Sequence, residues 1–581
     1  MAPFDLQAPR RTWLLLGGLV ALHLVVNVVW IGRDLSLRSF DGALHVEATA
    51  QIQAVLSQEG LGGLGRVLRG DEAGWWPSPA YLPWAAAGLL CGLSIDTLRL
   101  FNLVYLGVLV LAVFVIGRRL HSPAAGLLAA ALVTLYPAVY GDSRQIGLDL
   151  PGAALTALNI ALLLATERFS RARTSALLGL AAGIGILIRP QNVALLALPA
   201  LLLLVSGLRH PGDVSRRSTL LNAALALAVA AATSAVWWLG RLDALLAVAG
   251  AHQVGTMDRL GAGFTAAFYL ESLPWCFSLF LLLAGGLALG SLALRAREDA
   301  RQRRPGWLER PGIAVLLAWL LGGALFLLAF RVKGLRYLLP LAPAVALLTG
   351  CGLLSIPHRR LRRLIVALTL VVAVATWLLD SFNPTGPLVF GLEGGALSRP
   401  TRRREAARDI RATSGPPEHD GIMQAAADLA ELLRRRHGGG RGLFLHFRCG
   451  VEAHVDELPH CVPEYGPRWL AVPVIAARLP GLWYSWSGFS PRQLRSGDVT
   501  ARFGGARVPV PASRVETCYI VRFQDAPPGG EPPPARQPGT LADLVFEAVA
   551  REHPAASPVR ITAWRARSCS YLRGWTGATA H

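Results

Sequence analysis

Charged residues are scarce in this chain. Only 16% of its 581 residues are charged, whereas 53% are hydrophobic, and the mean hydropathy is +0.43. Soluble domains carry about 25% charged residues, so this composition excludes a soluble globular protein and indicates a polytopic membrane protein. Arginine supplies almost all of the net charge of +20, because Lys333 is the only lysine. The arginines lie in short stretches between apolar runs and not among aromatics, so the sequence predicts no nucleic-acid partner.

Several motifs of other protein classes are missing. The sequence has no C-x2-C pair of the kind that binds zinc, no internal repeat, and no glycine-rich phosphate loop in its C-terminal region. Three of the seven cysteines fall in apolar segments and are expected to be small core residues. The other four lie in the polar C-terminal region, where they would form two disulfides in an oxidising compartment, with a zinc site as the alternative. These four are Cys449, Cys461, Cys518 and Cys569.

Long apolar runs are plentiful. A helix needs about 20 mostly apolar residues to span a bilayer, and the sequence predicts eleven such spans. The first follows Arg10 and Arg11, and its length favours an uncleaved anchor over a signal peptide. The expected spans cover residues 13–31, 98–117, 122–139, 150–166, 174–188, 190–207, 219–239, 271–294, 312–330, 336–354 and 364–380.

Arginine-rich connections between these spans predict the orientation. Such loops lie in the cytoplasm in most membrane proteins, which would place the N-terminus inside and everything after residue 380 outside. The arginine-rich connections are 117–122, 168–173, 209–217, 295–310 and 358–363. The outer loops are then 32–97, 140–149, 189, 240–270 and 331–335. The apolar stretch 78–94 is short and begins near Pro79 and Pro83, so we expect an interfacial or membrane-embedded helix there and not a crossing.

The sequence therefore predicts two domains. Residues 1–380 form a transmembrane module, and the polar residues 381–581 form a soluble extracytoplasmic α/β domain. Within the second domain we expect helices at 423–440 and 541–553 and strands at 441–447 and 518–523. We expect the functional site to lie in the transmembrane module, which would be in the inner (cytoplasmic) membrane.

Polar side chains gather in the predicted outer loops. In the first loop, Asp41 and His45 would share one face of a helix, as a base and its orienting partner or as an ordinary cap and solvated turn. The second loop contributes Asp142, Arg144, Gln145 and Asp149, of which Asp149 has helix capping as an alternative role. Another short outer connection contributes Arg189. A divalent cation bound by Asp41, His45, Asp142 and Asp149 is feasible, but no ligand pattern requires one.

The segment 331–337 carries cations on the outer side, against the positive-inside trend. Arg331, Lys333 and Arg336 fall within six residues, next to Tyr337. They are either snorkelling side chains at the interface or a site for a phosphate or pyrophosphate group.

The order of these elements resembles the C-type superfamily of integral-membrane glycosyltransferases. The resemblance covers about residues 12–380 and is nearest to the branch of protein O-mannosyltransferases and the lipid A aminoarabinose transferase. It rests on "FDGALH", "WWPSPAYLP", "GRRLHSPAAGLLAAAL", "SRQIGLDLPGAALTAL" and "RYLLPLAPAVALLTG". The chain departs from the pattern at Gly42, where an acidic residue is usual.

The resemblance implies a polyprenyl-phosphate sugar donor and transfer to a lipid, glycan or protein acceptor. Asp41 would be the general base, and Lys333, Arg336 and Tyr337 would hold the lipid phosphate. His45, Arg144 and Asp149 would shape the sugar and acceptor pocket. Two alternatives stay open: a transporter or flippase of a lipid-linked substrate, and a non-catalytic relative, which Gly42 keeps in consideration.

Overall fold

A computed structural model gives the fold of the chain. It describes residues 9–34, 40–70, 77–209, 214–239, 265–302, 311–329, 334–382, 421–439, 443–449, 475, 479, 483–487, 500–503, 506–509, 516–525, 542–550 and 559–566. The chain divides into two compact units. One contains Met1–Trp30 and Leu100–Pro416, and the other contains Ile31–Arg99 and Pro417–His581.

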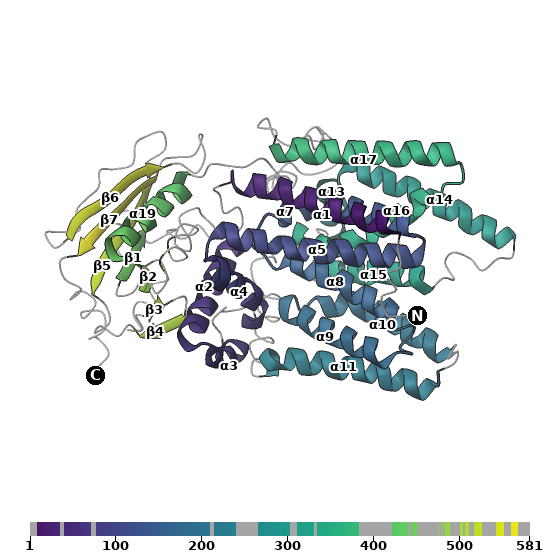
Figure 1. The fold of residues 1–581 in the computed structure, drawn as a ribbon, viewed down its shortest axis with the longest axis horizontal. Helices are drawn as coiled ribbons and strands as arrows, with labels where there is room; N and C mark the ends of the chain where they lie inside the picture. The colour runs from purple at the N-terminus through teal and green to yellow at the C-terminus, as the bar shows by residue number, and fades with distance from the viewer. Residues whose placement is uncertain are drawn as a thin grey trace. The chain divides into compact units, whose positions relative to one another are not determined.

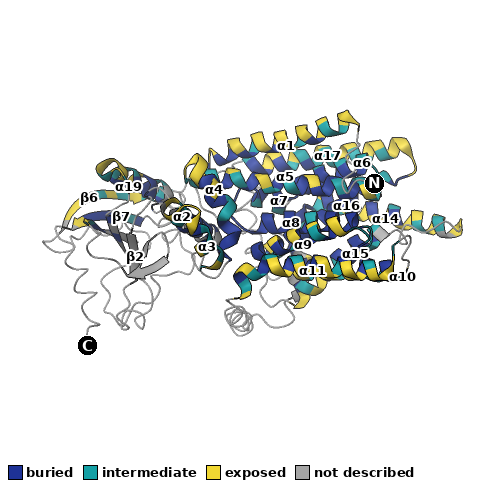
Figure 2. Ribbon diagram, turned by 60° about the horizontal axis from the view of Figure 1, so that its bottom comes forward, coloured by how far each residue is buried: buried dark blue, intermediate teal, exposed yellow. Residues whose placement is uncertain are grey.

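The first unit is a bundle of apolar helices (Figure 1). Its helices are α1 (Arg10–Ile31), α5 (Ile95–Leu120), α6 (Pro123–Thr134), α7 (Pro137–Asp142), α8 (Asp149–Ala165), α9 (Ala172–Ile188), α10 (Asn192–Arg209), α11 (Arg216–Trp238), α13 (Thr265–Phe277), α14 (Leu279–Arg301), α15 (Pro311–Ala329), η6 (Leu335–Leu341), α16 (Ala342–Leu354) and α17 (Arg359–Phe382). The bundle is centred on α8 and α16, whose side chains are almost all buried. Figure 2 shows the outer helices α1, α11 and α17 with long exposed faces. Those faces carry leucine and valine, as lipid-facing surfaces do.

The predicted spans correspond to helices of the described chain. Eight of these helices are long and apolar enough to cross a membrane, and they confirm a multi-pass membrane protein. The span expected at 122–139 was wrong as one continuous helix, because Tyr136 has extended backbone and separates α6 from α7. The spans expected at 150–166 and 174–188 are shorter apolar helices, α8 and α9. The span expected at 271–294 was wrong as one continuous helix, because Ser278 adopts a positive φ of 63° and divides it into α13 and α14.

Glycines allow the closest approaches between helices. A Cβ atom at Gly179 of α9 would lie 2.3 Å from the main-chain oxygen of Ala226 in α11, and one at Gly183 would lie 2.5 Å from Cβ of Thr233. Such contacts are sterically excluded for any residue with a side chain. Small residues therefore bring α9 and α11 into backbone contact, which supplies the packing that holds helices together in lipid.

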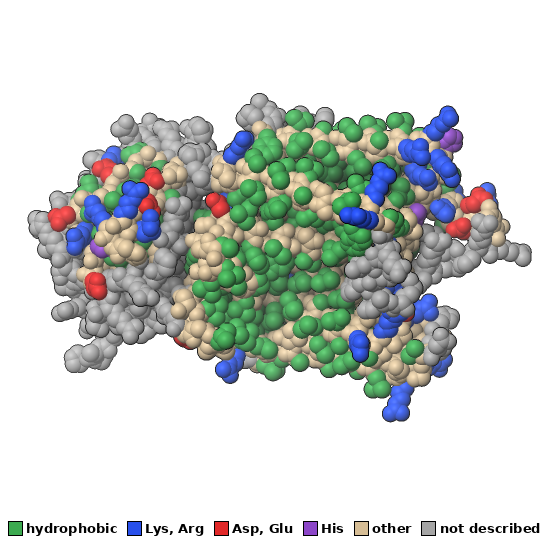
Figure 3. Space-filling model, in the orientation of Figure 1, with side chains coloured by type: hydrophobic (Ala, Val, Ile, Leu, Met, Phe, Trp, Pro, Cys, Tyr) green, Lys and Arg blue, Asp and Glu red, His purple; other side chains and the backbone are tan. Residues whose placement is uncertain are grey.

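The arginine-rich connections meet at one end of the bundle. Arg119 pairs with Glu167 at 3.4 Å, which joins the α5–α6 connection to the α8–α9 connection. His121 bonds to Ser355 at 3.4 Å, which adds the connection before α17. Figure 3 shows Lys and Arg side chains concentrated at one end of the bundle and a broad hydrophobic surface along its length. The Lys and Arg side chains thus lie mainly at the end of the bundle where the arginine-rich connections meet, which is the end predicted to face the cytoplasm.

The residues between α1 and α5 fold into short helices within the second unit. They are α2 (Phe40–Glu59), α3 (Gly62–Arg69), η1 (Ser78–Tyr81) and α4 (Leu82–Cys91). The apolar stretch 78–94 thus contains a helix of only 10 residues, about 15 Å long at 1.5 Å per residue. That length is about half of a hydrocarbon core, in agreement with the prediction that this stretch does not cross.

In the C-terminal part of the second unit, the described residues include a mixed sheet and the helix α19 (Gly421–His437). The strand order is β4-β3-β2-β1-β5-β7-β6, and β1 pairs in parallel with β2 and β5. The strands are β1 (Leu443–Cys449), β2 (Trp483–Ser487), β3 (Thr500–Phe503), β4 (Ala506–Pro509), β5 (Thr517–Asp525), β6 (Ala542–Ala550) and β7 (Val559–Ala566). The helix expected at 423–440 and the strands expected at 441–447 and 518–523 are confirmed.

The helix expected at 541–553 was wrong. Residues Ala542–Ala550 form β6, which pairs antiparallel with β7 and has a register irregularity between Leu544 and Phe546. The apolar spacing of this segment fits a helix, but its valine and phenylalanine residues also suit a strand. The partner strand, which lies further along the chain, decided between the two by pairing with the backbone of β6.

Candidate functional site

A buried polar loop connects α7 to α8 at the end of the bundle away from the arginine-rich connections. Asn102, in α5, donates from its side-chain amide to the main-chain oxygens of Asp142 at 3.1 Å and Gln145 at 2.9 Å. The carboxylate of Asp142 accepts a hydrogen bond of 2.7 Å from the N–H of Leu150 in the first turn of α8. This hydrogen bond pairs one of the N–H groups that have no partner within the first turn of the helix.

Asp149 and Arg189 form an ion pair beside this loop. Nη2 of Arg189 lies 2.5 Å from Oδ1 of Asp149, and the two side chains are only 3% and 10% exposed. Asp149 begins α8, and Arg189 follows the last residue of α9. The N-cap residue of α8 is Leu148, whose side chain forms no cap bond. The carboxylate of Asp149, in the first turn, is directed to Arg189.

The surroundings of Arg189 hold it in place. A Cβ atom at Gly152 would lie 2.9 Å from Cγ of Arg189, so only glycine leaves room for the arginine stem against α8. Asn192, at the start of α10, donates to the main-chain oxygen of Gly185 at 3.2 Å and accepts from the hydroxyl of Thr156 at 3.0 Å. The ends of α8, α9 and α10 are thus joined by buried hydrogen bonds, which fix the direction of the guanidinium.

Asp142 lies in the loop between predicted spans, and its burial matters for the charge of the site. Burial, and then the nearby charge of Asp149, raise the pKa of Asp142 to about 8. The raised pKa disfavours a second negative charge on Asp142 beside the carboxylate of Asp149.

Arg144 has several contacts within the protein. Its Nε donates to Asn27 of α1 at 2.8 Å and its Nη2 donates to Ser381 of α17 at 2.8 Å. Its guanidinium carbon lies 5.0 Å from the ring centre of Trp30, and the side chain is fully buried. These contacts tie the loop to the first and last helices of the bundle, so Arg144 holds the loop between α1 and α17.

The predicted cation segment is partly described. Arg336 and Tyr337 lie in η6, which packs against α7 and α8. The guanidinium carbon of Arg336 lies 5.5 Å from the ring centre of Tyr337, and Arg336 is exposed while Tyr337 is half-buried. Lys333 and Arg331 lie outside the described residues. The structure thus brings Arg336 and Tyr337, in η6, next to the helices that carry Asp142 and Asp149.

Asp41 and His45 belong to the second unit. Asp41 lies in the first turn of α2, and its side chain is outside the described part of the structure. His45 is buried, and its Nδ1 forms a hydrogen bond of 2.7 Å with the hydroxyl of Tyr81. This bond joins α2 to η1.

Sequence reasoning missed several residues of this region. Asn102, Asn192 and Thr156 hold the buried loop and Arg189, and each stands within or beside an apolar run. A polar side chain in such a run is a signal, because it needs a hydrogen-bond partner inside the bundle. Among the residues that the structure describes, no three His, Cys, Asp or Glu side chains gather as a metal site would require.

Comparisons with known proteins agree with this architecture. Residues 77–238 match the sequence model of the family described as dolichyl-phosphate-mannose-protein mannosyltransferase. A crystal structure of ArnT from Cupriavidus metallidurans bound to undecaprenyl phosphate is similar over 97% of this chain and 99% of that chain, with 15% identity and a TM-score of 0.55. The apo state of the same protein is similar over 95% of this chain and 97% of that chain, with 16% identity and a TM-score of 0.51. No curated protein matches by sequence. The resemblance is thereby confirmed: the chain has the fold of the C-type integral-membrane glycosyltransferases.

Proposed function

We propose that this protein is a membrane glycosyltransferase that takes a sugar from a polyprenyl-phosphate donor. One observation carries the proposal, namely the structural similarity to ArnT bound to undecaprenyl phosphate over nearly the whole of both chains. The family match over residues 77–238 supports it, because that description also names a polyprenyl-phosphate sugar as donor. These similarities favour a transferase over a transporter or flippase. The acceptor is a lipid, a glycan or a protein with a free hydroxyl or similar nucleophile.

Asp41 is the general base in this proposal. Its carboxylate takes the proton of the acceptor hydroxyl while the acceptor oxygen attacks the anomeric carbon of the sugar. The bond between that carbon and the phosphate oxygen breaks, and the lipid phosphate leaves with the electron pair. The position of Asp41 in the first turn of α2 suits an ionised carboxylate, because the N-terminal end of a helix favours negative charge.

The cation segment receives the leaving group. Arg336, Lys333 and Tyr337 bind the lipid phosphate, whose negative charge grows as the bond breaks, and fixed cations stabilise that charge without a further proton transfer. The exposure of Arg336 supports this role, since a lipid headgroup can reach it. Its neighbour Tyr337 faces the guanidinium and offers a hydroxyl as a second hydrogen-bond donor.

The remaining site residues shape the sugar and acceptor pocket. Asp149 and Arg189 form its charged wall, and Asp142 and Gln145 belong to the loop beside them. His45 and Arg144 act through their neighbours, because each is buried and bonded within the protein. A divalent cation is not required by this chemistry.

The reaction takes place at the outer face of the cytoplasmic membrane in this proposal. The arginine-rich connections gather at the end of the bundle away from Asp142 and Asp149, and arginine-rich loops are typically cytoplasmic. Cys518 is disulfide-bonded, which fits a C-terminal domain in an oxidising, extracytoplasmic compartment.

The test uses the purified protein in lipid nanodiscs with a radiolabelled polyprenyl-phosphate sugar. We expect wild type to release the sugar from its carrier and Asp41→Asn to lose at least about a hundredfold in turnover, in the range of general-base removal. Glu47→Gln is the matched control, since it neutralises another carboxylate of α2. Equal turnover by wild type and Asp41→Asn would refute the assignment of the base, and no turnover by wild type would favour a non-catalytic relative.

A further inference from the structure

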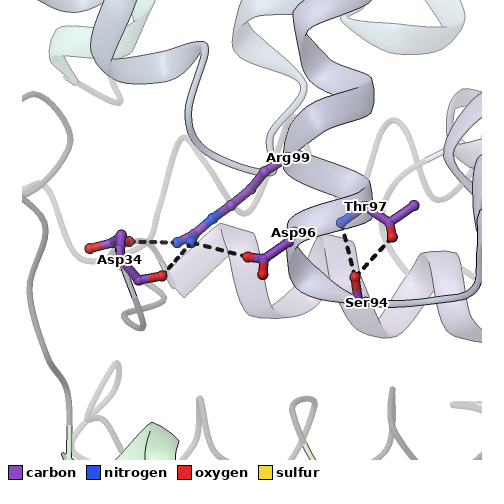
Figure 4. A network of polar contacts seen from close by, with 5 residues as sticks. All are labelled: Asp34, Ser94, Asp96, Thr97 and Arg99. Carbon is purple, nitrogen blue, oxygen red and sulfur yellow. Dashed lines mark hydrogen bonds and ion pairs between the residues drawn. The ribbon is translucent and has the colours of Figure 1, made fainter. Parts of the chain in front are cut away.

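A buried ion pair joins the two ends of the segment that carries Asp41 (Figure 4). We call residues 35–93 the excursion, since they lie between the end of α1 and the start of α5. Nη2 of Arg99 donates to Oδ2 of Asp34 at 3.0 Å, and Nη1 donates to the main-chain oxygen of the same residue at 3.2 Å. One guanidinium thus binds both the side chain and the backbone at the point where the excursion begins.

The pair is fully buried. The side chain of Arg99 is 1% exposed and that of Asp34 is 0% exposed, whereas the third charged group, Asp96, is 59% exposed at 3.9 Å from Arg99. Burying two charges removes their hydration, so such pairs are often no more stabilising than apolar side chains of the same size. A contribution to stability is therefore a poor explanation for this pair. A better explanation is that the pair fixes the position of Asp34 relative to the start of α5.

Both partners are attached to rigid backbone. The hydroxyl of Ser94 accepts from the N–H of Thr97 at 3.0 Å and also bonds its side chain at 2.9 Å, which caps the start of α5 (Figure 4). Arg99 follows in the first turns of that helix. The N–H of Asp34 bonds to the main-chain oxygen of Ile31 at 3.2 Å, which extends the last turn of α1. The two charged groups thus join two helix ends with little freedom of movement.

We propose that Arg99 and Asp34 are positioning residues for Asp41. Asp34 precedes Asp41 by seven residues and the start of α2 at Phe40 by six, so a fixed Asp34 limits how far the start of α2 can move. This proposal rests on the proposed function, because it takes Asp41 as the base. A displacement of about 1 Å in a reacting group can cost about a hundredfold in rate. Holding the ends of the excursion in place therefore affects turnover more than donor binding.

The kinetic test compares Arg99→Gln, Arg99→Lys and Arg66→Gln. Arg66 is the matched control, since it pairs with Glu59 at 2.7 Å in the same excursion but is 48% exposed. We expect Arg99→Gln to lower kcat by about a hundredfold, with the KM for the lipid donor within about twofold of wild type. Arg99→Lys recovers part of the loss, because it keeps the charge without the two-pronged contact. The proposal would be overturned if kcat for Arg99→Gln stayed within about twofold of wild type. It would also be overturned if the activity fell only in proportion to the amount of folded protein.

A second measurement is independent of activity. Spin labels at Leu61→Cys, which replaces an 89% exposed residue beyond α2, and at Val104→Cys on α5 report the position of the excursion relative to α5. The background is Cys91→Ala, because Cys91 is exposed, and a sample without the two engineered cysteines must take up no label. We expect a narrow distance distribution in wild type and a broad one in Arg99→Gln. Identical distance distributions in the two proteins would refute the positioning role of Arg99. Absence of turnover in wild type would reject the proposed function and leaves this distance measurement valid.

Discussion

At the scale of the residue, the described polar groups around the α7–α8 loop have partners within the protein. Arg189 forms an ion pair with Asp149, and burial and the nearby charge of Asp149 raise the pKa of Asp142. Arg144 was expected to contact substrate from its place in the sequence, yet its hydrogen bonds are to Asn27 and Ser381. The sequence could indicate that these residues are special, since they interrupt apolar runs, but it could not tell a pocket residue from one that holds the pocket.

We expect Arg189→Gln to lower the free energy of unfolding by about 3–5 kcal/mol, because it leaves the buried carboxylate of Asp149 without its cation. The double variant with Asp149→Asn should be more stable than Arg189→Gln alone. Arg119→Gln is the control, since the Arg119–Glu167 pair is 39% and 37% exposed and is worth at most about 1 kcal/mol. Thermal unfolding in detergent measures all four proteins. A double variant no more stable than Arg189→Gln would contradict a coupled pair.

At the scale of the element, small residues decide how closely helices pack. The contact of α9 with α11 depends on Gly179 and Gly183, where an added Cβ would overlap the opposite helix. Helix types and most span positions follow from apolar length, so they were predictable. The break at Ser278 and the strand at Ala542–Ala550 were not, because each depends on how the segment packs or pairs with residues elsewhere in the chain.

Substitution of Gly179 tests this packing. We expect Gly179→Ala to lower the free energy of unfolding by about 1–3 kcal/mol, because its Cβ would lie 2.3 Å from the main-chain oxygen of Ala226 and the helices would have to separate. Gly290→Ala in α14 is the control: nothing lies within 4 Å of its Cβ, and alanine is a better helix former. Unfolding midpoints in SDS–detergent mixtures report both. A loss at Gly290 as large as at Gly179 would show that the effect is not steric.

At the scale of the whole molecule, charge is distributed between two ends of the bundle. Arginine-rich connections meet around Glu167 and Ser355, while the paired and hydrogen-bonded polar groups lie around Asp142 and Arg189. Electrostatic asymmetry of this kind directs membrane insertion, since arginines stay in the cytoplasm. The proposed orientation therefore makes a prediction for the intact cell.

Cysteine labelling tests the orientation. Arg360→Cys lies at the exposed start of α17, and Arg435→Cys replaces a 75% exposed residue of α19. In a Cys91→Ala background, we expect a membrane-impermeant maleimide to label position 435 once the outer barrier is opened, and position 360 only after the cytoplasmic membrane is permeabilised. The Cys91→Ala protein itself supplies the unlabelled control. The reverse order of labelling would overturn the proposed orientation.

The sequence by itself determined that this protein is a helical membrane protein, where most of its apolar helices lie and that its arginines gather in the connections between them. These features follow from local apolar length and charge, which need no knowledge of distant residues. Only the tertiary structure decided which polar residues are partners: Arg189 with Asp149, Arg144 with Asn27, and Arg99 with Asp34. The reason is physical, because a polar group in a low-dielectric interior is defined by the group that it meets, and that group lies far away along the chain.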